Sequence, residues 1–418
     1  MLKAVEQGRE PASPGFISAV AKALHITPEQ LTGAPYDDGK PLSDAVNELS
    51  VLLAEGRYVR AVEPGPLAGI DTDLVAAQRL YRRDRTLETI ERLPDLIRRI
   101  HGAVSDSSGE ERAHVSTVLT NAYLLAGWAI RRTGRPALML PALDLADHYA
   151  PTGNDPGWGS LAMLDRARML THYGESEVAD ALIDTVVTAT DSAHGSPVLA
   201  GYAHLVGAVN QARRLDYSGA MSHIEAARGL ASRTGETDEY VTAFGPVNVE
   251  IHAHAVELEA GDPNRAAVQG AKLSIPAGHR APTRVGHHWQ DNARAWLMSR
   301  KPERALAALN KARAAAPQQT ASIQRFGKPC TASRRRRGGA PTPSLVSPAG
   351  WVPHSDSRFH HLNGTLGSYE RSRRTRPVCH RHRLTRRQRY RQARGSRAGR
   401  RLGRVCDRLP RRQPVHRC

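Results

Sequence analysis

The chain has 418 residues, with 59 Lys and Arg against 41 Asp and Glu, and carries a formal net charge of +18. It has no run of about 18 apolar residues, which excludes a membrane-spanning helix, and its early acidic residues Glu6 and Glu10 argue against a signal peptide. All four cysteines follow residue 320, so a disulfide scaffold is excluded for the residues before it. We therefore expect a cytoplasmic protein without a membrane partner.

The first predicted element is a group of three short helices within residues 1–35. Ser13 is placed as an N-cap and Pro14 as the first helical residue after it. They precede apolar residues spaced as on one face of a helix: Phe16, Ile17, Val20, Ala21 and Leu24. Thr27 and Gln30 then form a capping box that begins a further helix. The pattern predicts three helices joined by two tight turns.

Residues 2–33 resemble the second half of the phage-repressor-like helix-turn-helix domain of bacterial regulators. The resemblance implies that residues 5–9 end a recognition helix, and that residues 14–24 and 28–31 form the two helices behind it. A complete domain of this kind has two further helices, and the start of its recognition helix contacts base edges. The resemblance therefore implies an incomplete DNA-binding module, unless translation begins upstream.

The resemblance also implies DNA contacts and a dimer. Lys3 and Arg9 are the candidate DNA-binding residues, through phosphate contacts, and two solvated charges are the alternative. Because heads of this kind usually read two half-sites, a homodimer is implied. The apolar side chains of Leu2, Val5 and Phe16 lack their partner helices, so we expect them to face water.

The next segment, residues 36–70, is predicted to be a linker with one helix over residues 43–54. A Glu-Pro-Gly-Pro sequence closes this linker, as is typical of a turn. Residues 71–84 and 86–104 then predict two helices, and the second carries apolar residues at helical spacing. We expect these two helices to form a leading hairpin.

Residues 71–318 contain a repeat of paired helices, with turn signals at Gly134, Gly174, Asp216, Gly261 and Lys301. The second helix of each pair has inward positions spaced i, i+4 and i+7: Met139/Leu143/Ala146, Ala179/Ile183/Val186, Ala220/Ile224/Ala227, Ala266/Gly270/Leu273 and Ala305/Leu309/Ala312. Twelve residues before each first member lies a small residue, with one exception: Gly127, Ala167, Ala208, His254 (the exception) and Ala293. This spacing predicts a tetratricopeptide-like α-solenoid.

Function in such a solenoid is expected on the concave surface that the first helices line. This surface can hold a peptide, a small molecule or a helix of a protein partner. We predict five polar residues at inward-facing positions as the contacts in this groove: Asn121, Tyr123, Arg166, Asn210 and Asn292. For each of them the alternative is an exposed or capping polar side chain.

Residues 319–418 are predicted to be an Arg-rich disordered tail. Of the basic residues, 26 follow Thr320 against three acidic ones, so the first 320 residues are mildly acidic. Few aliphatic residues and a high net charge predict disorder. Two origins stay open: a coding sequence read out of frame after about Thr320, or a genuine basic extension. The latter would bind nucleic acid through phosphates without reading its sequence.

No catalytic, metal-binding or cofactor-binding motif is present. The sequence lacks the P-loop, the dinucleotide-binding glycine pattern and the zinc-protease pattern, and the tail's Cys and His spacings match no zinc finger. We therefore expect no enzyme, no metal and no cofactor. The order of the head and the solenoid resembles actinomycete transcriptional regulators of the xenobiotic-response-element (XRE) class.

The XRE resemblance implies an all-α protein with a partial helix-turn-helix head, a tetratricopeptide-like α-solenoid and a disordered tail. In such a regulator the repeats receive a peptide, small-molecule or protein ligand and bias a DNA-binding head. The alternative is a tetratricopeptide-like protein-interaction scaffold without DNA binding.

Overall fold

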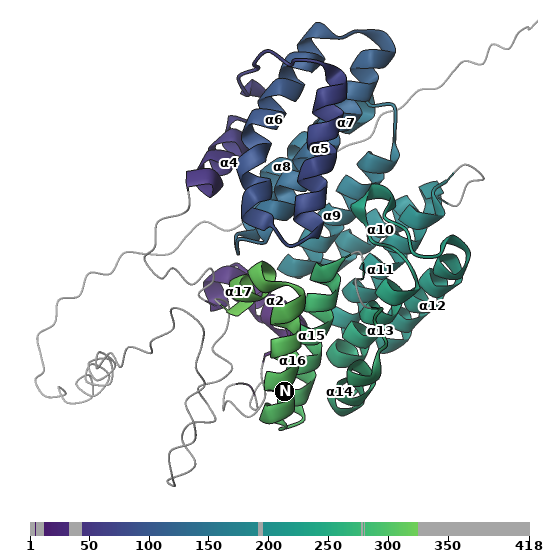
Figure 1. The fold of residues 1–418 in the computed structure, drawn as a ribbon. Helices are drawn as coiled ribbons and strands as arrows, with labels where there is room; N and C mark the ends of the chain where they lie inside the picture. Colours follow the sequence, from purple (N-terminus) through teal and green to yellow (C-terminus); the bar gives the residue numbers. More distant parts are fainter. Residues whose placement is uncertain are drawn as a thin grey trace, which may run out of the picture. The chain divides into compact units, whose positions relative to one another are not determined.

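Paired antiparallel helices make up the described part of this computed structural model (Figure 1). The structure describes residue 5 and residues 12–32, 44–190, 195–276, 279 and 281–324. All of them belong to one unit, Met1–Gly338, whereas the unit Gly339–Cys418 and most of the predicted tail lie outside the described residues. Within the described ranges every regular element is a helix, which confirms the predicted all-α class. None of these helices is long and apolar enough to cross a membrane.

The helices follow one another as hairpins from α5 onward. Three helices and a 3-10 turn precede them: α2 (Pro14–Ala23), α3 (Pro28–Thr32), α4 (Asp44–Glu55) and η1 (Gly56–Tyr58). The hairpins are α5 (Leu67–Arg82) with α6 (Thr86–Asp106), α7 (Gly109–Arg131) with α8 (Met139–Tyr149), α9 (Gly157–Tyr173) with α10 (Ser176–Thr190), α11 (Pro197–Arg213) with α12 (Tyr217–Thr234), α13 (Pro246–Ala260) with α14 (Pro263–Lys272), and α15 (Pro282–Met298) with α16 (Pro302–Ala315). Short 3-10 turns and a last helix complete the set: η2 (Pro136–Leu138), η3 (Ala150–Thr152), η4 (Glu239–Val241) and α17 (Pro317–Gln324).

Local turn chemistry sets the hairpin boundaries at the positions that the sequence predicts. Gly134 and Gly174 have positive φ values of 88° and 83°, which glycine adopts without a Cβ clash. Asp216 begins α12 by accepting a hydrogen bond from the Gly219 N–H at 2.9 Å. A cap of this kind contributes about 1 kcal/mol to helix stability.

The second helices from α6 to α14 each pack between the first helix of their own hairpin and the first helix of the next, whereas α16 packs against α15 and α17. The first helices α5, α7, α9, α11, α13 and α15 also contact one another in turn. We call the surface that these first helices form the inner face.

Thirteen of the fifteen predicted inward positions of the second helices are buried, whereas Leu273 and Leu309 are half-buried. Leu143, Ile183 and Ile224 are at most 1% exposed, and burial of each such side chain contributes about 1.5–3 kcal/mol. The predicted small residues allow the close approach that packing needs. At Gly127, for example, a Cβ would meet Met139 Cγ at 3.2 Å.

Helix α2 buries a different face from the apolar stripe that the sequence predicts. Its buried residues are Gly15, Ser18 and Ala21, whereas Leu24 is 57% exposed. The expectation that Phe16 faces water is wrong, because its side chain is half-buried. Helix α2 lies against α9 and α11. The small residues of α2 let the helix approach the repeats closely.

The last helix contacts the first hairpin. The Asp84 carboxylate, in the α5–α6 turn, is 2% exposed and accepts hydrogen bonds from the Gln318 and Gln319 backbone N–H groups at 2.7 and 3.1 Å. The Gln318 side-chain oxygen accepts in return from the Thr86 N–H at 2.8 Å. Asp84 thus satisfies the first N–H groups of α17. Helix α17 continues to Gln324, past the predicted end of the repeats at residue 318.

Candidate functional site on the inner face of the repeats

Helices α2 and α3 begin with the caps that the sequence predicts. Ser13 Oγ accepts from the Phe16 N–H at 3.1 Å. The capping box is complete, because Gln30 Oε1 accepts from the Thr27 N–H at 2.8 Å and Thr27 Oγ1 accepts from the Gln30 N–H at 3.2 Å. The first turn of each short helix is therefore capped by residues of its own segment.

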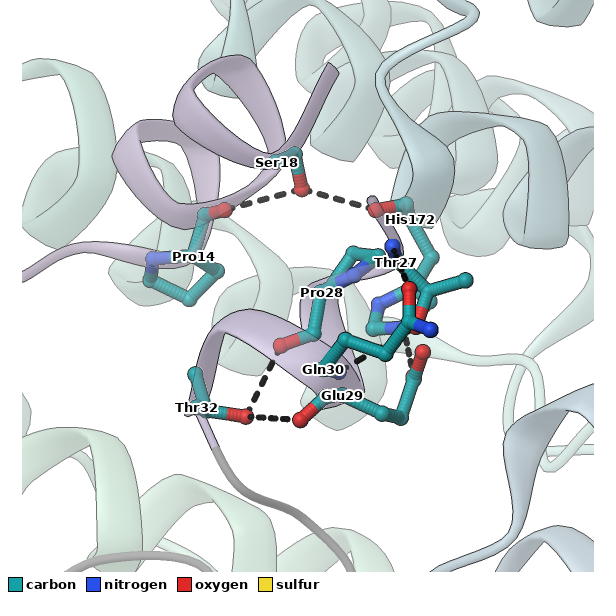
Figure 2. A network of polar contacts seen from close by, with 8 residues as sticks. All are labelled: Pro14, Ser18, Thr27, Pro28, Glu29, Gln30, Thr32 and His172. Atoms are coloured by element: carbon teal, nitrogen blue, oxygen red, sulfur yellow. Dashed lines mark hydrogen bonds and ion pairs between the residues drawn. The ribbon is translucent and has the colours of Figure 1, made fainter. Parts of the chain in front are cut away.

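His172, in the last turn of α9, joins both short helices (Figure 2). Its backbone carbonyl accepts a hydrogen bond from Ser18 Oγ of α2 at 2.8 Å. Its ring Nε2 lies 2.6 Å from Glu29 Oε1 of α3. Burial opposes ionisation of Glu29, but the hydrogen bond from His172 and the charge of that ring outweigh it and lower the pKa of this carboxyl. Glu29 therefore stays an anionic partner of His172.

A second anchor connects the start of α2 to two further hairpins. The Gly15 N–H donates to Glu259 Oε1 of α13 at 2.8 Å, and Arg294 of α15 donates to the other oxygen, Glu259 Oε2, at 2.9 Å. Gly15 also lies against α11, where a Cβ would stand 2.7 Å from the Arg213 carbonyl oxygen. Helix α2 thus contacts three consecutive first helices, α9, α11 and α13.

Four guanidinium groups, those of Arg131, Arg132, Arg168 and Arg284, cluster around His287 at one place on the inner face. Arg168 is neutralised by Asp165, to which it donates at 2.8 Å. Arg132 stacks on the Tyr81 ring, with its guanidinium carbon 3.5 Å from the ring centre, and has no carboxylate within ion-pair distance in the described residues. Nε of Arg131 is buried without a hydrogen-bond partner among the described residues. Burial and the neighbouring Arg168 lower the pKa of Arg131 to about 10, so it remains a cation at neutral pH.

The lowered pKa values of two histidines show that these guanidinium groups lie close together. Burial lowers the pKa of His287 well below its usual value, and the charges of Arg284, Arg131 and other guanidinium groups lower it further. Burial and Arg284 lower the pKa of His252 to about 3. Both rings are therefore neutral at pH 7, and the arginines provide the charge. Clustered guanidinium groups favour carboxylate or phosphate ligands, which they bind with paired hydrogen bonds.

A cavity of about 370 Å³ opens between α5, α7 and α9. Asn121 and Trp158 line it, together with Tyr240 from the α12–α13 connection. The Tyr240 hydroxyl donates to Asp155 at 3.0 Å, and its ring packs edge-on against Trp158. Tyr240 and Val241 both have left-handed backbone, with φ values of 52° and 59°. This strained connection therefore forms one wall of the cavity.

Among the five predicted groove residues, Asn121 lines this cavity. Its Oδ1 accepts from Gln78 Nε2 at 3.0 Å. Arg166 points to the second helix α8, where it pairs with Asp144 and Asp147 at 2.7 Å. Of these two predicted residues, Asn121 therefore lies in the cavity and Arg166 in an ion-pair cluster with α8.

The other three predicted groove residues are buried inside the repeats. The Tyr123 hydroxyl pairs with His101 Nε2 at 2.6 Å, and Asn292 donates to the Ala267 carbonyl at 3.0 Å. Asn210 bonds to Asp180 at 2.7 Å and to neighbouring groups of α9 and α10. Their polar atoms thus connect one helix to the next, and their role as ligand contacts stays a prediction.

The predicted DNA-binding residues Lys3 and Arg9 lie outside the described residues. Sequence patterns did not indicate Ser18, Glu29, His172 or Glu259. Their contacts join positions 143 to 244 residues apart, and helical periodicity reports only neighbours within a few turns. Comparison of the chain with protein-family models, curated proteins and solved structures finds no match.

Proposed function

We propose that this chain is a transcriptional regulator in which the inner face of the repeats receives a ligand and biases a DNA-binding head. The observation that carries the proposal is the seating of α2 and α3 on three first helices through Ser18, Glu29 and Gly15. A ligand that displaces the first helices relative to one another would change these contacts and so the position of α2 and α3. A two-state element that both sites contact is what coupling requires.

The local cluster of arginines around His287 supports an anionic ligand. Arg131 has an unpartnered buried Nε, and its neighbours Arg132 and Arg284 add positive charge close by. An acidic group bound there would offset the repulsion between these guanidinium groups. The ligand in this proposal therefore carries a carboxylate or a phosphate.

The test is selection of DNA sequences from a random duplex library. We would use the 418-residue chain and a form extended upstream along its reading frame. Binding of the selected duplexes would be measured by fluorescence polarisation at fixed salt. We expect a preferred duplex to bind at least about 1,000-fold more tightly than a scrambled one. If neither form prefers any duplex over the scrambled one, the proposal is wrong.

Two variants that each remove one positive charge make this test more specific. Lys3→Ala and Arg9→Ala should each weaken binding to all duplexes by a similar factor and reduce its salt dependence, because both residues are assigned to phosphate. Lys272→Ala, which removes an exposed charge at the end of α14, is the matched control and should leave binding unchanged.

The second candidate function is a protein-interaction scaffold without DNA binding. It is favoured by the close packing of α2, whose main chain at Gly15 is bonded to Glu259 as an integral part of the repeats. In this function α2 and α3 serve as a cap on the inner face. A partner that binds the full chain stoichiometrically, together with the absence of any DNA preference in both forms, would support the scaffold.

A further inference from the structure

The fifth hairpin, α13 with α14, departs from the others at one packing pair. In the other hairpins a small residue of the first helix is followed sixteen residues later by a large apolar residue: Gly127/Leu143, Ala167/Ile183, Ala208/Ile224 and Ala293/Leu309. In α13 and α14 the sizes are exchanged, with His254 in the first helix and Gly270 in the second. A Cβ on Gly270 would stand 2.3 Å from His254 Nε2. The imidazole therefore requires glycine at position 270.

This exchange places an unsatisfied polar ring in the protein interior. His254 is 7% exposed, and neither of its ring nitrogens has a hydrogen-bond partner in the described part of the chain. Burial lowers the pKa of His254 to about 4, and the nearby Ala266 carbonyl offsets this in part without a hydrogen bond of normal geometry. The ring is thus neutral at pH 7, with one N–H donor and one acceptor nitrogen. A buried polar group without a partner is costly, which makes it a candidate for ligand binding.

His254 and Gly270 both line a cavity of about 350 Å³ between α12, α13 and α14, which we call the α13 cavity. Its size lies at the lower end of small-molecule pockets and suits one or two fused rings. Met221, Ala253 and Leu273 provide apolar lining. The remaining lining is mostly polar, so a ligand here would be small, with an apolar part beside these three residues and a polar group that pairs with His254.

The charged groups of the α13 cavity already neutralise one another. Arg265 donates to both oxygens of Glu257, at 2.8 and 2.9 Å, and Tyr217 donates to the same carboxylate at 2.9 Å. Arg228 pairs with Glu250 at 2.8 Å. An ionic ligand would have to compete with these pairs, so an uncharged one is favoured. The two partly exposed guanidinium groups also favour the face of an aromatic ring.

We propose that the α13 cavity binds a small uncharged phenol, whose hydroxyl donates a hydrogen bond to His254. Both imidazole nitrogens are occluded in the unliganded chain, so the His254 ring turns towards the cavity and its neutral nitrogen accepts this bond. Met221 and Leu273 contact the phenol ring, and the guanidinium groups of Arg228 and Arg265 lie over its face. This site is separate from the arginines of the inner face and does not rest on the proposed regulatory function.

The test is equilibrium dialysis of the full chain at pH 7 with phenol, anisole and benzoate. Anisole keeps the ring but has no hydroxyl proton, and benzoate is charged. We expect saturable phenol binding that is about tenfold tighter than that of anisole, a ratio typical of one hydrogen bond, and no binding of benzoate. Equal binding of phenol and anisole, tighter binding of benzoate, or no saturable phenol binding would each overturn the proposal.

Two variants separate the hydrogen bond from the cavity. His254→Phe keeps a ring without the acceptor and should reduce the ratio of phenol to anisole affinity to about one. The double variant His254→Ala/Gly270→Ile restores the pair found at Ala208 and Ile224, fills the space and should lose binding of both molecules. Circular dichroism would select variants that remain folded. If either folded variant retains the tenfold preference for phenol, the assignment to His254 is wrong.

Discussion

Three buried histidines are neutral in the folded protein and would destabilise it if they were protonated. His101 pairs with the Tyr123 hydroxyl at 2.6 Å, His288 Nε2 donates to the Gly270 carbonyl at 2.9 Å, and His254 lines the α13 cavity. Burial lowers the pKa of each to about 4. In the unfolded chain the same rings titrate near 6.5. Protons therefore bind the unfolded state first as the pH falls.

This difference predicts loss of stability in mild acid. The contribution of the three rings is fully present above pH 6.5 and is lost as the pH falls towards about 4. Between pH 7 and pH 5 the free energy of unfolding should fall by at least about 2 kcal/mol, because each unit of pKa difference corresponds to about 1.4 kcal/mol. Urea titrations at the two pH values measure it.

Two histidine variants serve as a matched comparison for this acid effect. His101→Gln should reduce the loss, since the amide pairs with Tyr123 without titrating. His148→Gln, at an exposed position on α8, should leave the loss unchanged. A stability that stays constant between pH 7 and pH 5 would contradict the prediction.

The packing of helix α2 against the repeats depends on its small residues more than on its large apolar residues. The face that contacts the repeats consists of Gly15, Ser18 and Ala21. These small residues let the Gly15 N–H reach Glu259 and let the Ser18 hydroxyl reach the His172 carbonyl. The position of α2 therefore depends on its close backbone contact with the repeats and on these two hydrogen bonds.

Gly15→Ala should detach α2 from the repeats. The added methyl group would meet the Arg213 carbonyl oxygen at 2.7 Å and Glu259 Oε1 at 3.1 Å, so the helix must move. We expect a loss of about 1–3 kcal/mol and faster amide hydrogen exchange throughout α2. Gly229→Ala, in α12 with nothing within 4 Å of its Cβ, is the matched control and should be neutral or stabilising. Unchanged exchange in α2 of the Gly15 variant would show that the contact is unimportant.

The hairpins were predictable from the sequence because their signals are local. Glycines with left-handed backbone, such as Gly134 and Gly174, end helices, and positions such as Leu143 and Ile183 recur at the helical period. The seat of α2 was not predictable, because His172 carries no local signal for a partner 143 residues away. The same limit applies to Asn210, whose position on the first helix indicated the groove, whereas its amide bonds to α10.

The contact between α17 and the α5–α6 turn connects the two ends of the hairpin array. Asp84 is buried, has left-handed backbone with φ of 63°, and caps a helix 234 residues further along the chain. Burial raises the pKa of this carboxyl, although its hydrogen bonds from Gln318 and Gln319 oppose the shift. An open solenoid has nearest-neighbour contacts only. Here the first hairpin also contacts the last helix.

Asp84→Gly should release both ends together. Glycine keeps the left-handed backbone without strain and removes the carboxylate, so the variant isolates the cap. We expect a loss of about 1–2 kcal/mol, with faster hydrogen exchange both in α17 and in the α5–α6 turn. Asp216→Gly, which removes a cap within a single hairpin, should loosen α12 alone. Exchange that rises in α17 without a change near Asp84 would argue against coupling of the ends.

This contact also fixes how many hairpins the array can have. Repeat proteins with free ends gain or lose whole units by duplication or deletion, since each unit contacts only its neighbours. Here an added hairpin would carry Gln318 and Gln319 away from Asp84 and leave a buried carboxylate without its donors. The six hairpins of the described residues therefore form a set of defined number, which an inserted unit would disrupt even if the unit itself folds.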